Sequence, residues 1–387
     1  NPDVWEEVLR KLKISAMPPR KQDQPAKQQR QRFVAALEKT LDAAANADPY
    51  AGLTTIHRLN RAEYSNVIRD LFGLDLDLTE LLPSDGGDFG FDNIADLPRT
   101  SPMLLDRYMT VGLRVADMAL GNPDASLNTA TLKIPFDTSQ DKHLRGLPIG
   151  IRGGIATTHY FPADAEYIFA ARPFNGVAEG YFGIEGHDRP HEFLVYVDGE
   201  VVYSSEIGGP EDHKVSVEDG YVSVIPIIDK KLTSPKIPIT AGPHEVIFTW
   251  RERVSAEQNS WQPSLRASLE IHNPSGMPRL EEVRIEGPYN ATGVSDMATR
   301  DRVMSCEPES VAEEDACAKE ILTKLAKRAF RRAITEDDIA APLAFYKNER
   351  ASGGDFDQGI RASVARMIVS PFFLFRVETD ATDTPEG

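Results

Sequence analysis

The hydrophobic pattern of this 387-residue chain changes its period twice, and these changes constrain the fold more than any single motif. Up to about residue 121 the apolar residues recur at helical spacing. Between about 130 and 290 they alternate, and after 290 the helical spacing returns. Spacing of three or four places side chains on one helix face, whereas alternation places them on one face of a strand. The pattern predicts a multi-domain α + β protein in which helical modules flank a central antiparallel β-sandwich.

The first helical region carries clear start and stop signals. Asn60 and Glu63 form an Asn-x-x-Glu capping box before an apolar run, and Gly73 supplies the left-handed residue that often ends a helix. These signals predict a helix over 61–72. A serine cap and a proline at 101–102 predict that a second helix begins there.

Short alternating segments separated by turn residues fill the central region. Those that we expect to be strands lie at 166–174, 192–207, 221–227, 244–254 and 265–272. Asp198-Gly199 predicts a tight hairpin within the second of them, because type I′ turn residues must tolerate positive φ. Several short strands at such intervals favour a sandwich.

Composition limits the classes of function. The formal net charge of -17 argues against a nucleic-acid partner, which needs clustered cations. No apolar run is long enough to cross a bilayer, so we expect no transmembrane segment. No serine triad, glycosidase carboxylate pair or cysteine-histidine nucleophile stands out, and the sequence leaves open whether the chain is an enzyme.

Met17, in a Met-Pro-Pro segment between two amphipathic stretches, is the candidate cofactor ligand. Small c-type cytochromes present a methionine thioether to the sixth position of haem iron from such a loop. The Cys-x-x-Cys-His motif that attaches haem c is absent, so we expect that segment upstream of Asn1 or on another polypeptide. A surface methionine ahead of a helix explains the same local pattern.

A Gly-rich acidic segment is a candidate metal site. Asp85, Asp88 and Asp92 supply hard oxygen ligands that suit Ca²⁺. The match to an EF-hand is poor, and a solvated turn with Asx caps explains the same residues.

Exposed aromatic rings in the sandwich are candidates for stacking on sugar faces. Trp261, which lies in a loop sequence, and Tyr181 are the glycan-binding candidates. Trp250 alternates with expected core positions, which places it in the interior.

Cys306 and Cys317 are the two cysteines of the chain. Their spacing suits either a local disulfide or two unpaired thiols, and we favour the disulfide.

Four stretches, in order, resemble one family, the large secreted planctomycete-type cytochrome c proteins. They are WEEVLRKLKISAMPP, LNRAEYSNVIRDLFG with GFDNIADLPRTSPMLLDRY, LRGLPIGIRGGIATTHYFPADAEYIF, and CAKEILTKLAKRAFRRAITEDDI with GIRASVARMIVSPFFLFR. The resemblance implies that Met17 is an axial haem ligand and that Cys306 and Cys317 form a short loop clip. Together with expected linkers near 46–51, 122–129 and 287–293, it implies four parts. They are the C-terminal part of a cytochrome c-like domain (1–50), a helical module (51–125), a carbohydrate-binding-like β-sandwich (126–290) and a second helical module (291–387).

The resemblance also implies a functional class. We expect a periplasmic or extracellular fragment of a larger multi-domain c-type cytochrome that transfers electrons and binds a polysaccharide. Its partners would be a redox protein or further domains of the same precursor, and any enzyme activity would be that of an oxidoreductase acting through an associated haem c. The alternative is a structural or glycan-binding adhesion subunit without redox activity.

Overall fold

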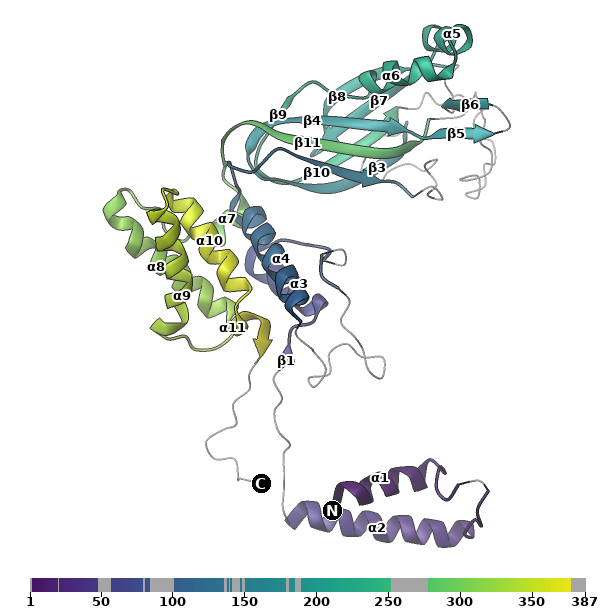
Figure 1. Ribbon diagram of the computed structural model, residues 1–387, viewed down its shortest axis with the longest axis vertical. Coiled ribbons are helices and arrows are strands. Elements are labelled where there is room, and N and C mark those ends of the chain that lie inside the picture. Colours follow the sequence, from purple (N-terminus) through teal and green to yellow (C-terminus); the bar gives the residue numbers. More distant parts are fainter. Residues whose placement is uncertain are drawn as a thin grey trace. The chain divides into compact units, whose positions relative to one another are not determined.

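The computed structural model describes residues 2–19, 21–47, 57–78, 81–83, 101–135, 138, 140, 147, 150–178, 181–184, 189–251 and 278–376. The chain divides into two compact units. One contains the N-terminal helices, and the other spans Leu59–Gly86 and Arg99–Leu374. Helices together with two antiparallel four-stranded sheets confirm the predicted fold class (Figure 1).

The first unit contains a helical hairpin of α1 (Pro2–Lys13) and α2 (Lys27–Ala47). Arg30 of α2 donates a 3.0 Å hydrogen bond to the hydroxyl of Ser15, and Lys13 forms an ion pair with Glu38. No residue of α2 is buried. The hairpin is therefore joined by polar contacts at its surface rather than by an enclosed apolar core.

A short antiparallel pair of strands also belongs to this unit. It joins β1 (His57–Arg58) to β12 (Phe375–Arg376).

In the described part of the second unit, seven helices form a helical body. They are α3 (Arg61–Phe72), α4 (Pro102–Leu120), α7 (Ala298–Asp301), α8 (Val311–Ala329), α9 (Glu336–Ala351), α10 (Phe356–Ile368) and α11 (Pro371–Leu374). The predicted signals of α3 are confirmed, because Asn60 and Glu63 form both hydrogen bonds of the capping box. Gly73 has the expected left-handed conformation at φ 77°.

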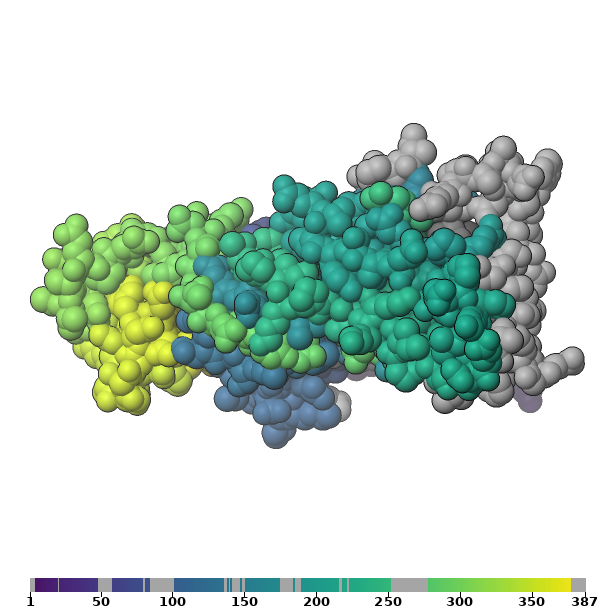
Figure 2. Space-filling view, turned by 90° about the horizontal axis from the view of Figure 1, so that it is seen from above, coloured from purple at the N-terminus to yellow at the C-terminus, as the bar shows by residue number. Residues whose placement is uncertain are grey.

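Helices from the two ends of this unit pack against each other. Helix α4 lies along α10, and the blue residues of α4 adjoin the yellow C-terminal helices in the space-filling view (Figures 1 and 2). The ring of Tyr64 on α3 lies 5.3 Å from that of Tyr108 on α4 and 5.5 Å from that of Phe373. The two expected helical modules therefore share one apolar core.

The central region forms two antiparallel sheets. The first has the order β3-β10-β7-β8 and the second β2-β11-β4-β9, and a separate ribbon joins β5 to β6. The strands are β2 (Asn128–Lys133), β3 (Ile151–Phe161), β4 (Asp164–Pro173), β5 (Asn175–Ala178), β6 (Tyr181–Ile184), β7 (His191–Val197), β8 (Glu200–Ile207), β9 (Ile237–Ile239), β10 (Gly242–Arg251) and β11 (Leu280–Gly293).

Aromatic side chains from both sheets fill the space between them. Phe169 of β4 contributes from one sheet, and Phe193, Phe248 and Trp250 contribute from the other. All four are 0% exposed, which confirms the interior position expected for Trp250. Burial of large rings contributes roughly 1.5–3 kcal/mol each, so this cluster is a main source of sandwich stability.

The predicted hairpin at Asp198-Gly199 is confirmed. These residues connect β7 to β8 with φ values of 51° and 82°, as a type I′ turn requires.

The prediction of a strand at 221–227 is wrong, because this segment belongs to helix α6 (Tyr221–Lys231), which follows α5 (Pro210–Glu218). Val224, Ile228 and Leu232 are buried in the sandwich core at intervals of four residues. This spacing forms one helix face. The apparent alternation at the start of the segment hid the helical period. The strand expected at 265–272 lies outside the described residues.

The sandwich is inserted between two parts of the helical body. The chain leaves α4 at Gly121 and returns through Val294, after β11 has continued past residue 290 to Gly293. A Cβ added to Gly121 would lie 2.6 Å from a methyl carbon of Val294, so both connections pass through one crowded point. Gly121 also has φ 79°, a conformation that glycine adopts easily.

Candidate functional site

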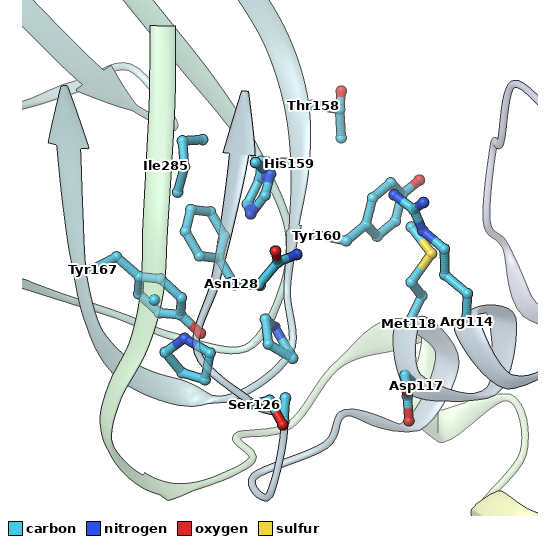
Figure 3. A pocket seen from close by; sticks show the side chains of 16 residues that line it. Arg114, Asp117, Met118, Ser126, Asn128, Thr158, His159, Tyr160, Tyr167 and Ile285 are labelled. Carbon is cyan, nitrogen blue, oxygen red and sulfur yellow. The ribbon is translucent and has the colours of Figure 1, made fainter. Parts of the chain in front are cut away.

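A cleft of about 410 Å³ lies between α4 and the sandwich, within the second unit (Figure 3). This volume is in the range of pockets that bind small molecules. Side chains of α4 form one wall, and residues of β2, β3, β4 and β11 form the other. The polar and titratable side chains that line it are Arg114, Asp117, Ser126, Asn128, Thr158, His159, Tyr160 and Tyr167.

The helical wall follows from the spacing of residues along α4. Arg114, Asp117 and Met118 are three and four residues apart, which places them on one side of the helix. Val111 and Val115 on α4 are 1% exposed. The same helix therefore contributes buried apolar side chains to the protein interior and polar ones to the cleft.

The sandwich wall is built around the end of β3. Phe161 is buried in the sandwich core, with its ring 4.6 Å from Tyr167 and 4.5 Å from His159. A Cβ on Gly287 would lie 2.3 Å from the Tyr167 ring, so glycine allows β11 to approach this ring closely. The ring contacts with Phe161 therefore hold the His159 side chain in place at the wall of the cleft.

Hydrogen bonds connect the end of β3, beside the cleft, to the helical body. The hydroxyl of Tyr160 donates to the carbonyl oxygen of Asp75 at 3.2 Å. The backbone N–H of Asn122 donates to the carbonyl oxygen of Pro162 at 2.6 Å. These bonds couple the end of β3 to the segments that follow α3 and α4.

The charges in the cleft are unevenly compensated. Asp117 lies 3.4 Å from Arg361 and accepts a hydrogen bond from Asn122, while burial raises the pKa of its carboxyl group. Arg114 is exposed and has no hydrogen bond or ion pair with another described residue. The cleft therefore contains a cation that is available to an external group.

His159 is the other notable group. Burial is the main cause that lowers its pKa to about 4, and the positive charges of Arg114 and the nearby His244 contribute to the same shift. At neutral pH the imidazole is uncharged, so it can exchange hydrogen bonds with a hydroxyl without adding charge.

Met17 lies in the bend between α1 and α2 of the first unit and is half-buried. The hairpin exposes large apolar side chains: Trp5 is 49% exposed and Phe33 is 52% exposed. The described part of the hairpin therefore leaves apolar surface uncovered.

The other predicted site residues fall in different places. Asp85, Asp88, Asp92 and Trp261 lie outside the described residues. Tyr181 begins β6, but its side chain is outside the described part. Cys306 and Cys317 form a disulfide.

The described residues contain no cluster of three or more His, Cys, Asp or Glu side chains that could hold a metal ion. None of the helices in the described ranges has the length and apolarity to cross a membrane.

The sequence did not indicate the cleft. Arg114, Asn128 and His159 come from a helix and two different strands, and no motif links them. Their proximity depends on how α4 docks on the sandwich, which no local pattern predicts.

Two segments match known families. Residues 57–121 match the family described as Protein of unknown function (DUF1587), and residues 317–378 match Protein of unknown function (DUF1595). Both families are typical of planctomycete cytochrome c-related proteins. No curated protein and no solved structure matches the chain significantly. One matched segment contains α3 and α4, which precede the sandwich in sequence, and the other contains most of α8 together with α9–α11, which follow it.

Proposed function

We propose that this chain is part of an extracytoplasmic, haem-linked electron-transfer protein, in which α1 and α2 close a cytochrome c domain and the later parts bind a partner. The observation that carries the proposal is that Met17 is only half-buried, in a hairpin that exposes apolar side chains. The two matched families support it, because they are typical of cytochrome c-related proteins.

The residues present fit one side of a haem site. Met17 offers a soft, neutral sulfur, and Trp5 and Phe33 offer apolar surface of the kind that covers a porphyrin. Both cysteines are joined to each other, so this chain offers no thiol for haem attachment. The haem would be held by a polypeptide segment outside these 387 residues. When bound, it supplies a one-electron redox centre whose potential a thioether ligand raises.

The test uses the native protein that contains this chain. Its absorption spectrum should show a c-type haem, and Met17→His should lower the reduction potential because imidazole replaces the thioether. Met103→His is the matched control, since Met103 is exposed on α4. Absence of haem from the native protein, or an equal potential in both variants, would refute the proposal.

The second candidate is a binding subunit without redox activity. It is favoured by the cleft, which has an available cation and several polar groups but no need for haem. Haem-free native protein that retains ligand binding would support this alternative.

A further inference from the structure

The cleft between α4 and the sandwich has the chemistry of a site for one negative charge. Arg114 is its available cation, whereas Asp117 already has Arg361 at 3.4 Å. A ligand with a single anionic group would pair with Arg114. A ligand with two or more charges would also meet the Asp117 carboxylate, and the lining offers no second free cation among the described residues.

The guanidinium narrows the choice of anion. Its planar fork forms two parallel hydrogen bonds with a carboxylate, and it is the cation best matched to that geometry. A carboxylate is also favoured over a compact inorganic ion because the other residues that line the cleft can contact the rest of an organic ligand.

The rest of the lining suits hydroxyl groups. The hydroxyls of Ser126 and Thr158 have no hydrogen-bond partner in the described part of the chain. Asn128 accepts a hydrogen bond through its side-chain oxygen, which leaves its amide nitrogen available as a donor. The uncharged imidazole of His159 can both donate and accept. Figure 3 shows the Asn128 amide between the His159 side of the cleft and the helix that carries Arg114.

Apolar surface completes the lining. Met118 of α4 and Ile285 of β11 lie on the two walls, and the ring of Tyr167 also lines the cleft. A saccharide combines apolar ring faces with equatorial hydroxyls, and a volume of about 410 Å³ is of the size used for small ligands.

We propose that this cleft binds a carboxylate-bearing saccharide, with Arg114 receiving the carboxylate and Asn128 and Thr158 contacting hydroxyl groups. Binding at this site does not depend on haem.

The experiment is calorimetric titration of the full chain with D-glucuronate, D-glucose, acetate and inorganic phosphate. D-glucuronate should bind more tightly than the other three. Arg114→Ala should weaken its binding about 10- to 100-fold, as expected for loss of a charge-assisted hydrogen bond. The affinity of Arg114→Lys for D-glucuronate should lie between those of the wild type and Arg114→Ala, because lysine keeps the charge but lacks the planar guanidinium.

Two further variants keep the result decisive. Thr158→Val, which keeps the side-chain size, should weaken D-glucuronate binding about 2- to 10-fold. Arg107→Ala removes another exposed arginine of α4 that does not line the cleft, and it should leave binding unchanged.

The proposal fails if D-glucuronate does not bind, or if D-glucose binds as well. If phosphate binds more tightly than D-glucuronate, the site prefers a different class of anion and the proposal is wrong. An equal loss in Arg107→Ala would mean that overall charge, rather than the cleft, attracts the ligand.

Discussion

The backbone N–H of Leu59 donates a 2.8 Å hydrogen bond to the carbonyl oxygen of Leu374, across more than three hundred residues of sequence. Leu59 lies at the start of the segment that matches DUF1587, and Leu374 lies near the end of the segment that matches DUF1595. The hydroxyl of Tyr108 donates to the carbonyl oxygen of Leu59 at 3.4 Å. The two matched segments are therefore complementary parts of one helical body.

The contact between α4 and α10 should not tolerate a methyl group at Gly112. A Cβ there would lie 2.5 Å from Val369 and 3.3 Å from the carbonyl oxygen of Ala365. We expect Gly112→Ala to destabilise the protein by about 1–3 kcal/mol in urea unfolding, because overpacking outweighs the higher helix propensity of alanine. Thr110→Ala, on the exposed side of α4, is the control. Equal midpoints for Gly112→Ala and wild type would contradict this packing.

Arg328 of α8 should stabilise the end of α3. It donates 3.0 Å hydrogen bonds to the carbonyl oxygens of Asp70 and Leu71, which lie in the last turn of α3. We expect Arg328→Ala to lower the free energy of unfolding by about 1 kcal/mol, because these carbonyls lose a cationic donor. Lys324→Ala, at an exposed position of the same helix, should change it by no more than about 0.5 kcal/mol. The prediction fails if the two variants are equally stable.

The disulfide between Cys306 and Cys317 closes a short loop of 11 residues in sequence separation. We expect the double variant Cys306→Ser/Cys317→Ser to lose about 2–3 kcal/mol, because the unfolded chain regains loop entropy. Urea unfolding with and without reductant provides the measurement. Reductant should shift the midpoint of the wild type but leave that of the double variant unchanged, and a shift in both would point to another cause.

His159 should contribute to loss of stability in acid. Its folded-state pKa is about 4, below the ordinary value of 6.5, so the unfolded chain binds the proton more readily. The contribution of the neutral imidazole to the free energy of unfolding is complete above pH 6.5. It is lost as the pH falls towards 4, by at most about 1.4 kcal/mol per pH unit.

His159→Gln should therefore flatten the decline in unfolding free energy between pH 6.5 and 4. Parallel pH profiles for wild type and His159→Gln would show that the imidazole is not buried as the structure places it.

Local signals predicted much of the secondary structure. The capping box of Asn60 and Glu63 and the turn at Asp198-Gly199 were both identified, because each depends on residues within a few positions. Helix α6 was missed because residues 221–225 satisfy both a period of two and a spacing of four. Only the burial of Ile228 and Leu232 on the same face distinguishes these periods.

Contacts between distant segments could not be predicted. The fit of Gly112 against Val369 and the approach of Arg114 towards His159 depend on how whole elements dock. A capping residue acts on its own helix, whereas these pairs are separated by long stretches of chain. The prediction that Met17 is a haem ligand differs from both, because that role depends on a cofactor outside the chain.

The close approach of Gly121 and Val294 has a consequence for the whole second unit. Because the β-sandwich leaves and rejoins the helical body at one narrow neck, its insertion does not separate the helices that precede it from those that follow it. Shortening or replacing the sandwich between these two residues should leave the packing of α4 on α10 in place.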